Sequence, residues 1–343
     1  MNRMYALCAL LLCSCSPRAV MPREEPHIHH ALAVHPYRYQ YLTDKEKKLY
    51  DTLVSSMLYH NDSAVLTGSF TYDEVNRVYQ LIYTDEYRLF CISPQFGCNT
   101  DSDTVSEVYF SYTCPADEQA VMQKRLDSAV SEILDAAKGR SDRDTVRIIH
   151  DQIIRRCTYS TGSYENSAYG CLVEGQALCQ GYTAAFEYLC SQAGIQTAPV
   201  ETADGSHIWA LVLLDGDYYH VDVTWDDPDD KDRPLYAKYD YFCTNDAGMA
   251  DRDISPEAPA ADGENDYFRA NSLVAADIKE ALRIIQTAVP DDGGAIQLRA
   301  ADKESFDSIT HELFDNRALA GIFPQKDIYY TYDRETLVIH IFP

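Results

Sequence analysis

The segment that decides the fold is residues 206–225, which read SHIWALVLLDGDYYHVDVTW. Aliphatic, aromatic and β-branched residues fill both halves, which predicts two strands, 206–213 and 218–225. Between them, Asp215 and Gly216 form one of the strongest sequence signals for a two-residue hairpin turn. We therefore expect an antiparallel β-hairpin here.

The turn also determines which residues face one another across the hairpin. With a two-residue turn, Trp209 lies opposite Asp222, so His207 and Asp222 become diagonal neighbours on one face. Diagonal Cα atoms lie about 7–8 Å apart, which an imidazole and a carboxylate can bridge. Val221 and Val223 point to the opposite, apolar face. The hairpin therefore predicts a His–Asp pair, provided that no bulge shifts the register.

A cysteine stands at the expected start of a helix that precedes the hairpin. The helix spans 179–193, and Gly194 suits the left-handed position that ends it. At a helix start, unpaired N–H groups and the dipole favour the thiolate of Cys179, and its own N–H would lie near a developing oxyanion. A cysteine nucleophile also needs a base and a group that orients the base. His207 and Asp222 can supply both, although each residue alone could equally be structural.

Three stretches of the chain resemble the motifs of bacterial transglutaminase-like proteins. They are the nucleophile segment SAYGCLVEGQALCQGY (167–182), the histidine segment SHIW (206–209) and the aspartate segment YYHVDVTWDDP (218–228). The resemblance covers about 145–255 and follows the family's order of Cys, His and Asp. It implies an α+β, papain-like core in which the cysteine helix packs on an antiparallel sheet carrying His and Asp. By this resemblance, Cys179 is the nucleophile, His207 the base and acid, and Asp222 the orienting group.

Other residues near these motifs have less certain roles. Gln176 is a weak candidate for the second oxyanion donor. Trp209 and Trp225, the only tryptophans of the chain, flank the motifs and could either pack around the hairpin or contact substrate. The sequence departs from the family at Ala210, where many relatives have Asn. It also departs at Cys171, which could be a second thiol near the site.

The N-terminus resembles a bacterial secretion signal. Arg3 supplies a positive charge, and residues 4–13 form an apolar run too short to span a membrane. The run ends in Leu12-Cys13-Ser14-Cys15, which resembles a lipobox with Cys15 as the lipidated residue. We expect a membrane-anchored, extracytoplasmic lipoprotein of the cell envelope, with an ordinary cleaved signal peptide as the alternative.

The whole chain predicts a central enzyme domain with small α+β domains on either side. The expected parts are a lipoprotein signal peptide at 1–15, a tether at 16–36, an N-terminal α+β domain at 37–115, a transglutaminase-like domain at 116–260 and a C-terminal α+β domain at 270–343. The expected helices are 43–58, 73–82, 116–138, 142–156, 276–288 and 302–314. The further expected strands are 64–70, 87–92, 105–112, 295–299, 327–332 and 335–341, and 167–175 is expected to be a loop.

Composition narrows the partners and the redox chemistry. A formal charge of −25 disfavours nucleic acid as a partner. The family resemblance implies a protein or peptide substrate, and we expect contact with the membrane only through the lipid. The sequence contains no C-x-x-C pair of the kind that forms zinc sites, and we expect neither a metal nor a cofactor. Removing Cys8, Cys13 and Cys15 from eleven cysteines leaves eight, so an unpaired catalytic thiol requires at least one more unpaired cysteine within the molecule.

These observations predict a cysteine enzyme that forms a thioester on protein or peptide amides. Water as the acceptor would make it a peptidase or amidase, and a lysine amine would make it a cross-linking transglutaminase; the sequence does not choose between them. The alternative is a non-catalytic surface binding module that retains the fold.

Overall fold

The structure is a computed structural model that describes residues 36–228, 236–250, 252–256, 258–288, 295–324 and 327–343. The predicted signal peptide, its lipidation residue Cys15 and all but the last residue of the tether lie outside the described residues. The fold class is α+β, as predicted. Within the described part of the chain, no helix is both long and apolar enough to cross a bilayer.

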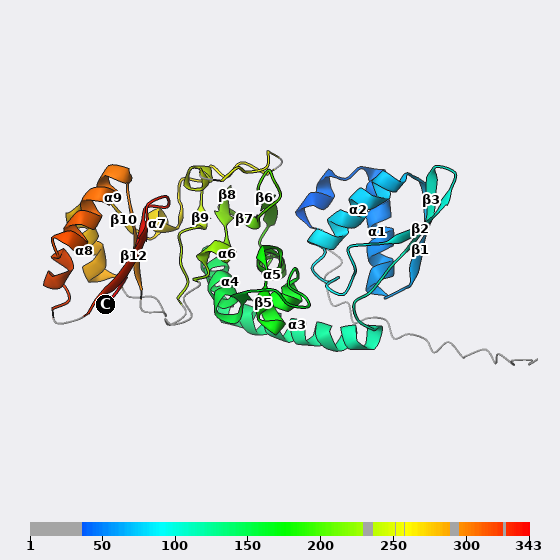
Figure 1. The fold of residues 1–343 in the computed structure, drawn as a ribbon, viewed down its shortest axis with the longest axis horizontal. Coiled ribbons are helices and arrows are strands. Elements are labelled where there is room, and N and C mark those ends of the chain that lie inside the picture. Colours follow the sequence, from blue (N-terminus) through cyan, green and yellow to red (C-terminus); the bar gives the residue numbers. More distant parts are fainter. Residues whose placement is uncertain (1–35, 229–235, 251, 257, 289–294, 325–326) are drawn as a thin grey trace, which may run out of the picture. The chain divides into compact units, whose positions relative to one another are not determined.

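The N-terminal region combines two helices with a three-stranded antiparallel sheet (Figure 1). A short 3-10 helix, η2 (Tyr37–Tyr41), precedes them. Both helices are capped by a threonine whose side chain accepts a hydrogen bond from the backbone N–H of a glutamate three residues later. The glutamate side chain in turn accepts the backbone N–H of the threonine, which completes a capping box. The elements are α1 (Asp44–Leu58), β1 (Ser63–Phe70), α2 (Tyr72–Asp85), β2 (Gly97–Asp101) and β3 (Thr104–Tyr109), and the strand order is β1-β3-β2.

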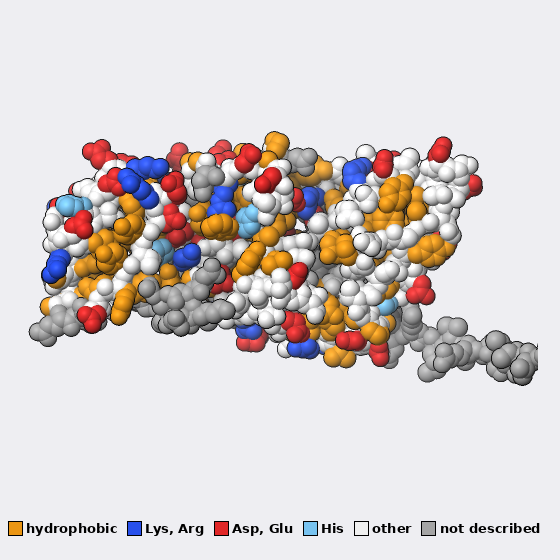
Figure 2. Space-filling view, viewed as in Figure 1, with side chains coloured by type: hydrophobic (Ala, Val, Ile, Leu, Met, Phe, Trp, Pro, Cys, Tyr) orange, Lys and Arg blue, Asp and Glu red, His pale blue; other side chains and the backbone are white. Residues whose placement is uncertain are grey.

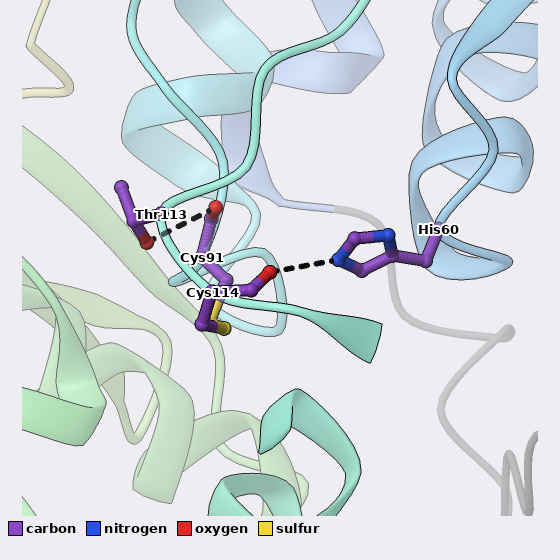
Figure 3. The surroundings of a disulfide bond; sticks show 4 residues. All are labelled: His60, Cys91, Thr113 and Cys114. Atoms are coloured by element: carbon purple, nitrogen blue, oxygen red, sulfur yellow. Dashed lines mark hydrogen bonds between the residues drawn. A yellow bond between two sulfur atoms is a disulfide. The ribbon is translucent and has the colours of Figure 1, made fainter. Parts of the chain in front are cut away.

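The strand predicted at 87–92 is wrong, and β2 was missed. Phe90 and Cys91 are buried in the central hydrophobic cluster, so the apolar residues of this stretch pack on irregular backbone instead of pairing along a strand. Cys91 forms a disulfide with Cys114, and its carbonyl accepts the hydroxyl of Thr113 (Figure 3). Six other described cysteines are free, which agrees with the requirement for an unpaired cysteine besides the nucleophile.

The central region combines three helices with a four-stranded antiparallel sheet. The helices are α3 (Ala116–Ala137), α4 (Asp142–Arg156) and α5 (Cys179–Gln192), followed by the sheet strands β6 (Thr197–Glu201), β7 (Ile208–Leu214), β8 (Asp217–Val221) and β9 (Phe242–Thr244). The strand order is β6-β7-β8-β9, and α5 packs on β6, β7 and α4. The cysteine-bearing helix thus lies on the sheet that includes the predicted hairpin.

The hairpin has the predicted register. Leu214 pairs with Asp217 and Ala210 with Val221, and both turn residues, Asp215 and Gly216, have positive φ angles of 57° and 100°. This is the backbone that a type I′ turn requires.

The second hairpin strand is shorter than predicted. It ends at Val221 instead of continuing to 225, because Asp222 begins the short helix α6 (Val223–Asp226). The Asp222 carboxylate accepts the N–H of Trp225 and so caps this helix, which turns the chain out of the sheet.

The predicted loop at 167–175 is mostly helical, which corrects the sequence interpretation. It contains a π-helical turn, η3 (Gly170–Glu174), that Gly175 ends at φ +73°. Its small residues allow close backbone packing: a Cβ on Gly170 would lie 2.1 Å from the carbonyl oxygen of Tyr164. On either side, β4 (Thr158–Tyr159) and β5 (Gln176–Ala177) pair in parallel.

The C-terminal region contains the predicted helices and strands. Its elements are α7 (Tyr267–Ala270), β10 (Val274–Ala275), α8 (Ile278–Thr287), β11 (Ile296–Ala300), α9 (Lys303–Thr310), η5 (His311–Asp315), η6 (Ala318–Gly321), β12 (Tyr329–Asp333) and β13 (Val338–Phe342). Earlier in the chain, η4 (Asp246–Met249) contacts β8 and β9 of the central sheet. The sheet order is β10-β11-β13-β12. Separate hydrophobic clusters form in this region, in the N-terminal region and around α5, while the exact domain boundaries stay predictions.

The Gly181→Ala variant tests the close packing at the start of α5. A Cβ there would lie 2.4 Å from the carbonyl oxygen of Glu165, so we expect overpacking to lower the free energy of unfolding by about 1–3 kcal/mol in urea denaturation. Gly97→Ala is the matched control, because its Cβ would meet only Tyr109 side-chain atoms at 3.6 and 3.9 Å. Equal stability of the two variants would contradict the close approach.

Candidate active site

Cys179 is the first residue of α5. The backbone before it is anchored by the N–H of Leu178, which donates to the carbonyl oxygen of Glu165 at 2.9 Å. Partial burial opposes ionisation of the thiol. A hydrogen bond with His207 and the N–H groups of Ile208 and Gln180 outweigh it and lower the pKa of Cys179 below its usual value. The sulfur is therefore held in surroundings that favour the thiolate.

His207 connects this sulfur to a buried carboxylate. Its Nε2 lies 2.7 Å from Oδ2 of Asp222, whose side chain is fully buried. That contact leaves Nδ1 as the ring nitrogen for the hydrogen bond with Cys179. Burial disfavours the imidazolium, but the contacts with Asp222 and Cys179 raise the pKa of His207 to about 9. The structure thus brings together Cys179, His207 and Asp222, which we call the triad.

Thr183 ties the two halves of the triad together and was missed from the sequence. Its buried hydroxyl lies 2.9 Å from the carbonyl oxygen of Cys179 and 3.1 Å from that of Ile208. One side chain therefore links the first turn of α5 to the start of β7, beside His207. A threonine on the buried face of a helix was the only signal in the sequence, and it does not reveal the partner 25 residues away.

Trp209 lies behind His207 and is held by a second polar pair. The indole is buried and stacks on the imidazole of His207, with ring centres 5.5 Å apart. Its N–H donates to Nδ1 of His220 at 2.9 Å, and Nε2 of His220 lies 2.9 Å from Asp246. Burial lowers the pKa of His220, so its ring is neutral and donates to Asp246. Of the two roles considered for Trp209, this burial supports packing.

The other residues singled out in the sequence occupy different surroundings. Trp225 is half-exposed, and its ring and that of His207 lie edge to face at 83°, with centres 6.3 Å apart. Gln176 is exposed on β5, where its side chain lies against Gly162, and its role as an oxyanion donor stays a prediction. Cys171 is buried beside Cys157, and burial raises the pKa of its thiol well above the usual value, so it is not a reactive second thiol.

A buried histidine anchors the helix that Asp222 caps. His150 on α4 lies 3.0 Å from Asp151 and 3.1 Å from Asp226 of α6. Burial disfavours its charge, yet the two carboxylates raise the pKa of His150 to about 9. Asp226 also accepts the N–H of Tyr241 at 2.9 Å. This buried network fixes α6, and with it the backbone of Asp222, against α4.

Residues 129–223 match the model of the transglutaminase-like superfamily, a span that contains all three members of the triad. These residues therefore resemble the core of that superfamily. The predicted resemblance is confirmed for this core, whereas the lipoprotein assignment stays a prediction. Across the described residues, no group of three or more His, Cys, Asp or Glu side chains could hold a metal ion.

Three solved structures are similar to parts of this chain at low sequence identity. A TGase structure has 13% identity and a TM-score of 0.27 over 47% of this chain and 50% of its own. A candidate protease from Parabacteroides distasonis has 13% identity and a TM-score of 0.24 over 38% and 36%. A candidate cysteine protease from Cytophaga hutchinsonii has 14% identity and a TM-score of 0.25 over 39% and 63%.

The chain spans less than two thirds of the length of each of these structures. Likeness of this degree carries no argument about activity. Among curated proteins, nothing matches the chain.

The Asp222→Asn variant tests whether the buried carboxylate sets the charge state of the triad. Asn caps helices as well as Asp does, so α6 should persist while His207 loses its anionic partner. The pKa of His207 should fall and that of Cys179 should rise. We expect the rate of Cys179 alkylation by iodoacetamide at pH 7 to drop about tenfold, with its pH midpoint shifted upward.

Asp246→Asn is the matched control, because it removes the carboxylate that pairs with His220 of the hairpin strand β8. Its effect on the pH midpoint should be much smaller. Equal profiles for the two variants would show that Asp222 does not control the thiol.

The Thr183→Val variant tests the link between α5 and β7. Valine keeps the shape and removes the hydroxyl, so the free energy of unfolding should fall by about 1 kcal/mol. Alkylation of Cys179 at pH 7 should slow several-fold, because the thiol and the imidazole of His207 are no longer held at hydrogen-bonding distance. Thr310→Val is the control: its hydroxyl bonds the carbonyl of Phe306 on α9, so its loss should leave alkylation unchanged.

Proposed function

We propose that this protein is a cysteine enzyme that transfers acyl groups through a thioester on Cys179. One observation carries the proposal: a fully buried carboxylate lies 2.7 Å from the ring nitrogen of a histidine that contacts a thiol with a lowered pKa. Perturbed pKa values of this kind cluster at functional sites. The arrangement supports a thiolate–imidazolium pair at neutral pH, since the thiol is more acidic and the imidazole more basic than usual.

In the proposed reaction, the Cys179 thiolate attacks the carbonyl carbon of an amide. The C–N bond then breaks as His207 gives its proton to the departing amine, and a thioester remains on Cys179. Water or a second amine attacks the thioester, His207 takes the proton of this acceptor, and the thiolate leaves. Asp222 stabilises the imidazolium whenever His207 carries the second proton.

The start of α5 supports stabilisation of the oxyanion. The first N–H groups of a helix have no partner within it, and the dipole adds positive potential at this end. The N–H of Cys179 is therefore the proposed first donor, with Gln176 still a candidate for the second. Removing one such donor in other enzymes typically costs a factor of about 10²–10³ in rate.

The acyl acceptor and the location are part of the proposal. Water would make the protein a peptidase or amidase, and a lysine amine would make it a cross-linking enzyme of protein substrates. An extracytoplasmic position, anchored by lipid on Cys15, is supported by the N-terminal sequence and by the Cys91–Cys114 disulfide, since disulfides persist in oxidising compartments. Asp and Glu side chains spread over the face seen in Figure 2, which fits a solvated surface.

A non-catalytic binding module is the second candidate. Such a module has no need for a thiol with a lowered pKa beside an imidazole with a raised one. The electrostatics of Cys179 and His207 therefore favour the enzyme.

Mass spectrometry of casein incubated with the protein and a labelled primary amine tests this function. The wild type should either attach the amine to casein, which means transfer, or produce cleavage fragments, which means hydrolysis. Cys179→Ala should abolish both, because it removes the sulfur on which the proposed thioester forms. Cys98→Ala is the control, since it removes a free, half-buried thiol of β2 and should retain activity.

Wild type and Cys179→Ala giving identical products would count against an enzyme that acts on such substrates. Slow alkylation of Cys179 in the wild type, at the rate of an ordinary thiol, would count against the proposed chemistry altogether.

A further inference from the structure

The guanidinium group of Arg252 lies beside the buried carboxylate of the triad, and none of the sequence motifs includes this residue. Arg252 follows η4, and its side chain is only 10% exposed. Its Nη1 lies 3.9 Å from Oδ2 of Asp222, the same oxygen that contacts His207. At that length the contact is an attraction between charges and not a short hydrogen bond. Arg252 is therefore a second cation beside the buried carboxylate.

The same guanidinium lies over two aromatic rings. Its central carbon is 4.4 Å from the ring centre of Trp225 and 4.8 Å from that of Tyr241. The two rings meet at 66°, with centres 6.2 Å apart. A planar guanidinium attracts aromatic faces electrostatically and packs flat on them, which an ammonium group does less well. This stacking restricts the orientation of the Trp225 indole.

Trp225 is an exposed aromatic residue next to the triad, on the side of His207 and Asp222. Half of its surface is open to solvent, and its backbone N–H donates to Oδ1 of Asp222. Because the ring centres of Trp225 and His207 lie only 6.3 Å apart, a substrate whose amide reaches the triad would bring its neighbouring side chain close to this indole. A large open apolar surface beside the reacting groups is suited to contact with an apolar or aromatic side chain.

We propose that Arg252 is a positioning residue with two effects: it fixes the indole of Trp225, and it balances the charge of Asp222. Held in this way, Trp225 is the surface that selects acyl donors with an aromatic side chain beside the reacting amide. This inference rests on the proposed function and adds the substrate class to it. Arg252 acts through Trp225 and Asp222 and does not touch the reacting atoms. Trp225 makes the substrate contact.

The charge of Arg252 has a defined effect on the triad. The ionisable groups that face His207 are Cys179 and Asp222. Tyr159 interacts with Cys179, and behind Asp222 lie Arg252 and the neutral His220. A nearby cation disfavours the imidazolium and favours the thiolate. Without Arg252, the pKa values of both His207 and Cys179 should therefore rise, and the pH window of the ion pair should move upward.

Labelling of Cys179 with three reagents separates these roles. Iodoacetamide needs no side-chain contact, whereas the chloromethyl ketones of acetyl-phenylalanine and acetyl-glycine differ only by a benzyl group. The rate of each reaction is measured by intact-protein mass over a pH series. The preference is the ratio of the phenylalanine rate to the glycine rate, which cancels changes in the thiol itself.

We expect the wild type to prefer the phenylalanine reagent and Trp225→Ala to lose this preference. Arg252→Met should reduce the preference about fivefold, the size expected when a stacking contact of about 1 kcal/mol is lost. It should also move the iodoacetamide midpoint to higher pH. Arg252→Lys should restore the midpoint, because the charge returns, but not the preference, because the flat stacking does not.

Arg299→Met is the matched control. Arg299 also lies over a ring, 5.3 Å from the centre of Phe268, and contacts a carboxylate, 2.7 Å from Asp266, with a side chain 15% exposed. Its loss should leave both readouts unchanged.

An unchanged preference and midpoint in Arg252→Met would overturn the inference, as would a wild type that reacts equally with both ketones. Recovery of the preference in Arg252→Lys would overturn the stacking role. In all of these cases a fast iodoacetamide reaction of the wild type would leave the proposed function standing, whereas a slow one would overturn that function itself.

Discussion

The structure around the active site depends on compensating one carboxylate that is buried inside the protein. A buried charge is costly unless opposite charges and hydrogen bonds compensate it. Asp222 is fully buried, and its oxygens meet the His207 ring, the N–H of Trp225 and, more distantly, Arg252. These partners come from the start of β7, from α6 and from the segment after η4. The position of each element is therefore constrained by the need to reach the same carboxylate.

Much of this arrangement could be predicted because local sequence determines it. A two-residue Asp-Gly turn allows only one hairpin register, so the pairing of His207 with Asp222 followed from counting residues. The end of the second strand did not follow, because Val221, Asp222 and Val223 alternate as a strand would. The pattern cannot reveal that the carboxylate prefers to cap a helix. Likewise, the apolar residues at 87–92 gave no sign that they pack on irregular backbone next to a disulfide.

The supporting residues could not be predicted, because their roles exist only through tertiary contacts. Thr183 acts by donating a hydrogen bond to the carbonyl of Ile208, and His150 acts by its contact with Asp226, which is 76 residues away. Arg252 lies in a segment without a strong periodic pattern, and only the folded chain places it over Trp225. Each of these side chains is common in unrelated surroundings, so type and spacing alone carry no information about them.

The Cys91–Cys114 cross-link gives the chain a topological property that the triad does not need. It joins two residues at a sequence separation of 23 and so closes a loop that contains both β2 and β3. A protease that cuts once inside this loop would leave two fragments covalently joined, with the edge of the N-terminal sheet still tethered to the start of α3. In an environment rich in proteases, such a molecule could therefore be cleaved without separating into fragments. The cleavage would become visible on a denaturing gel only after the disulfide is reduced.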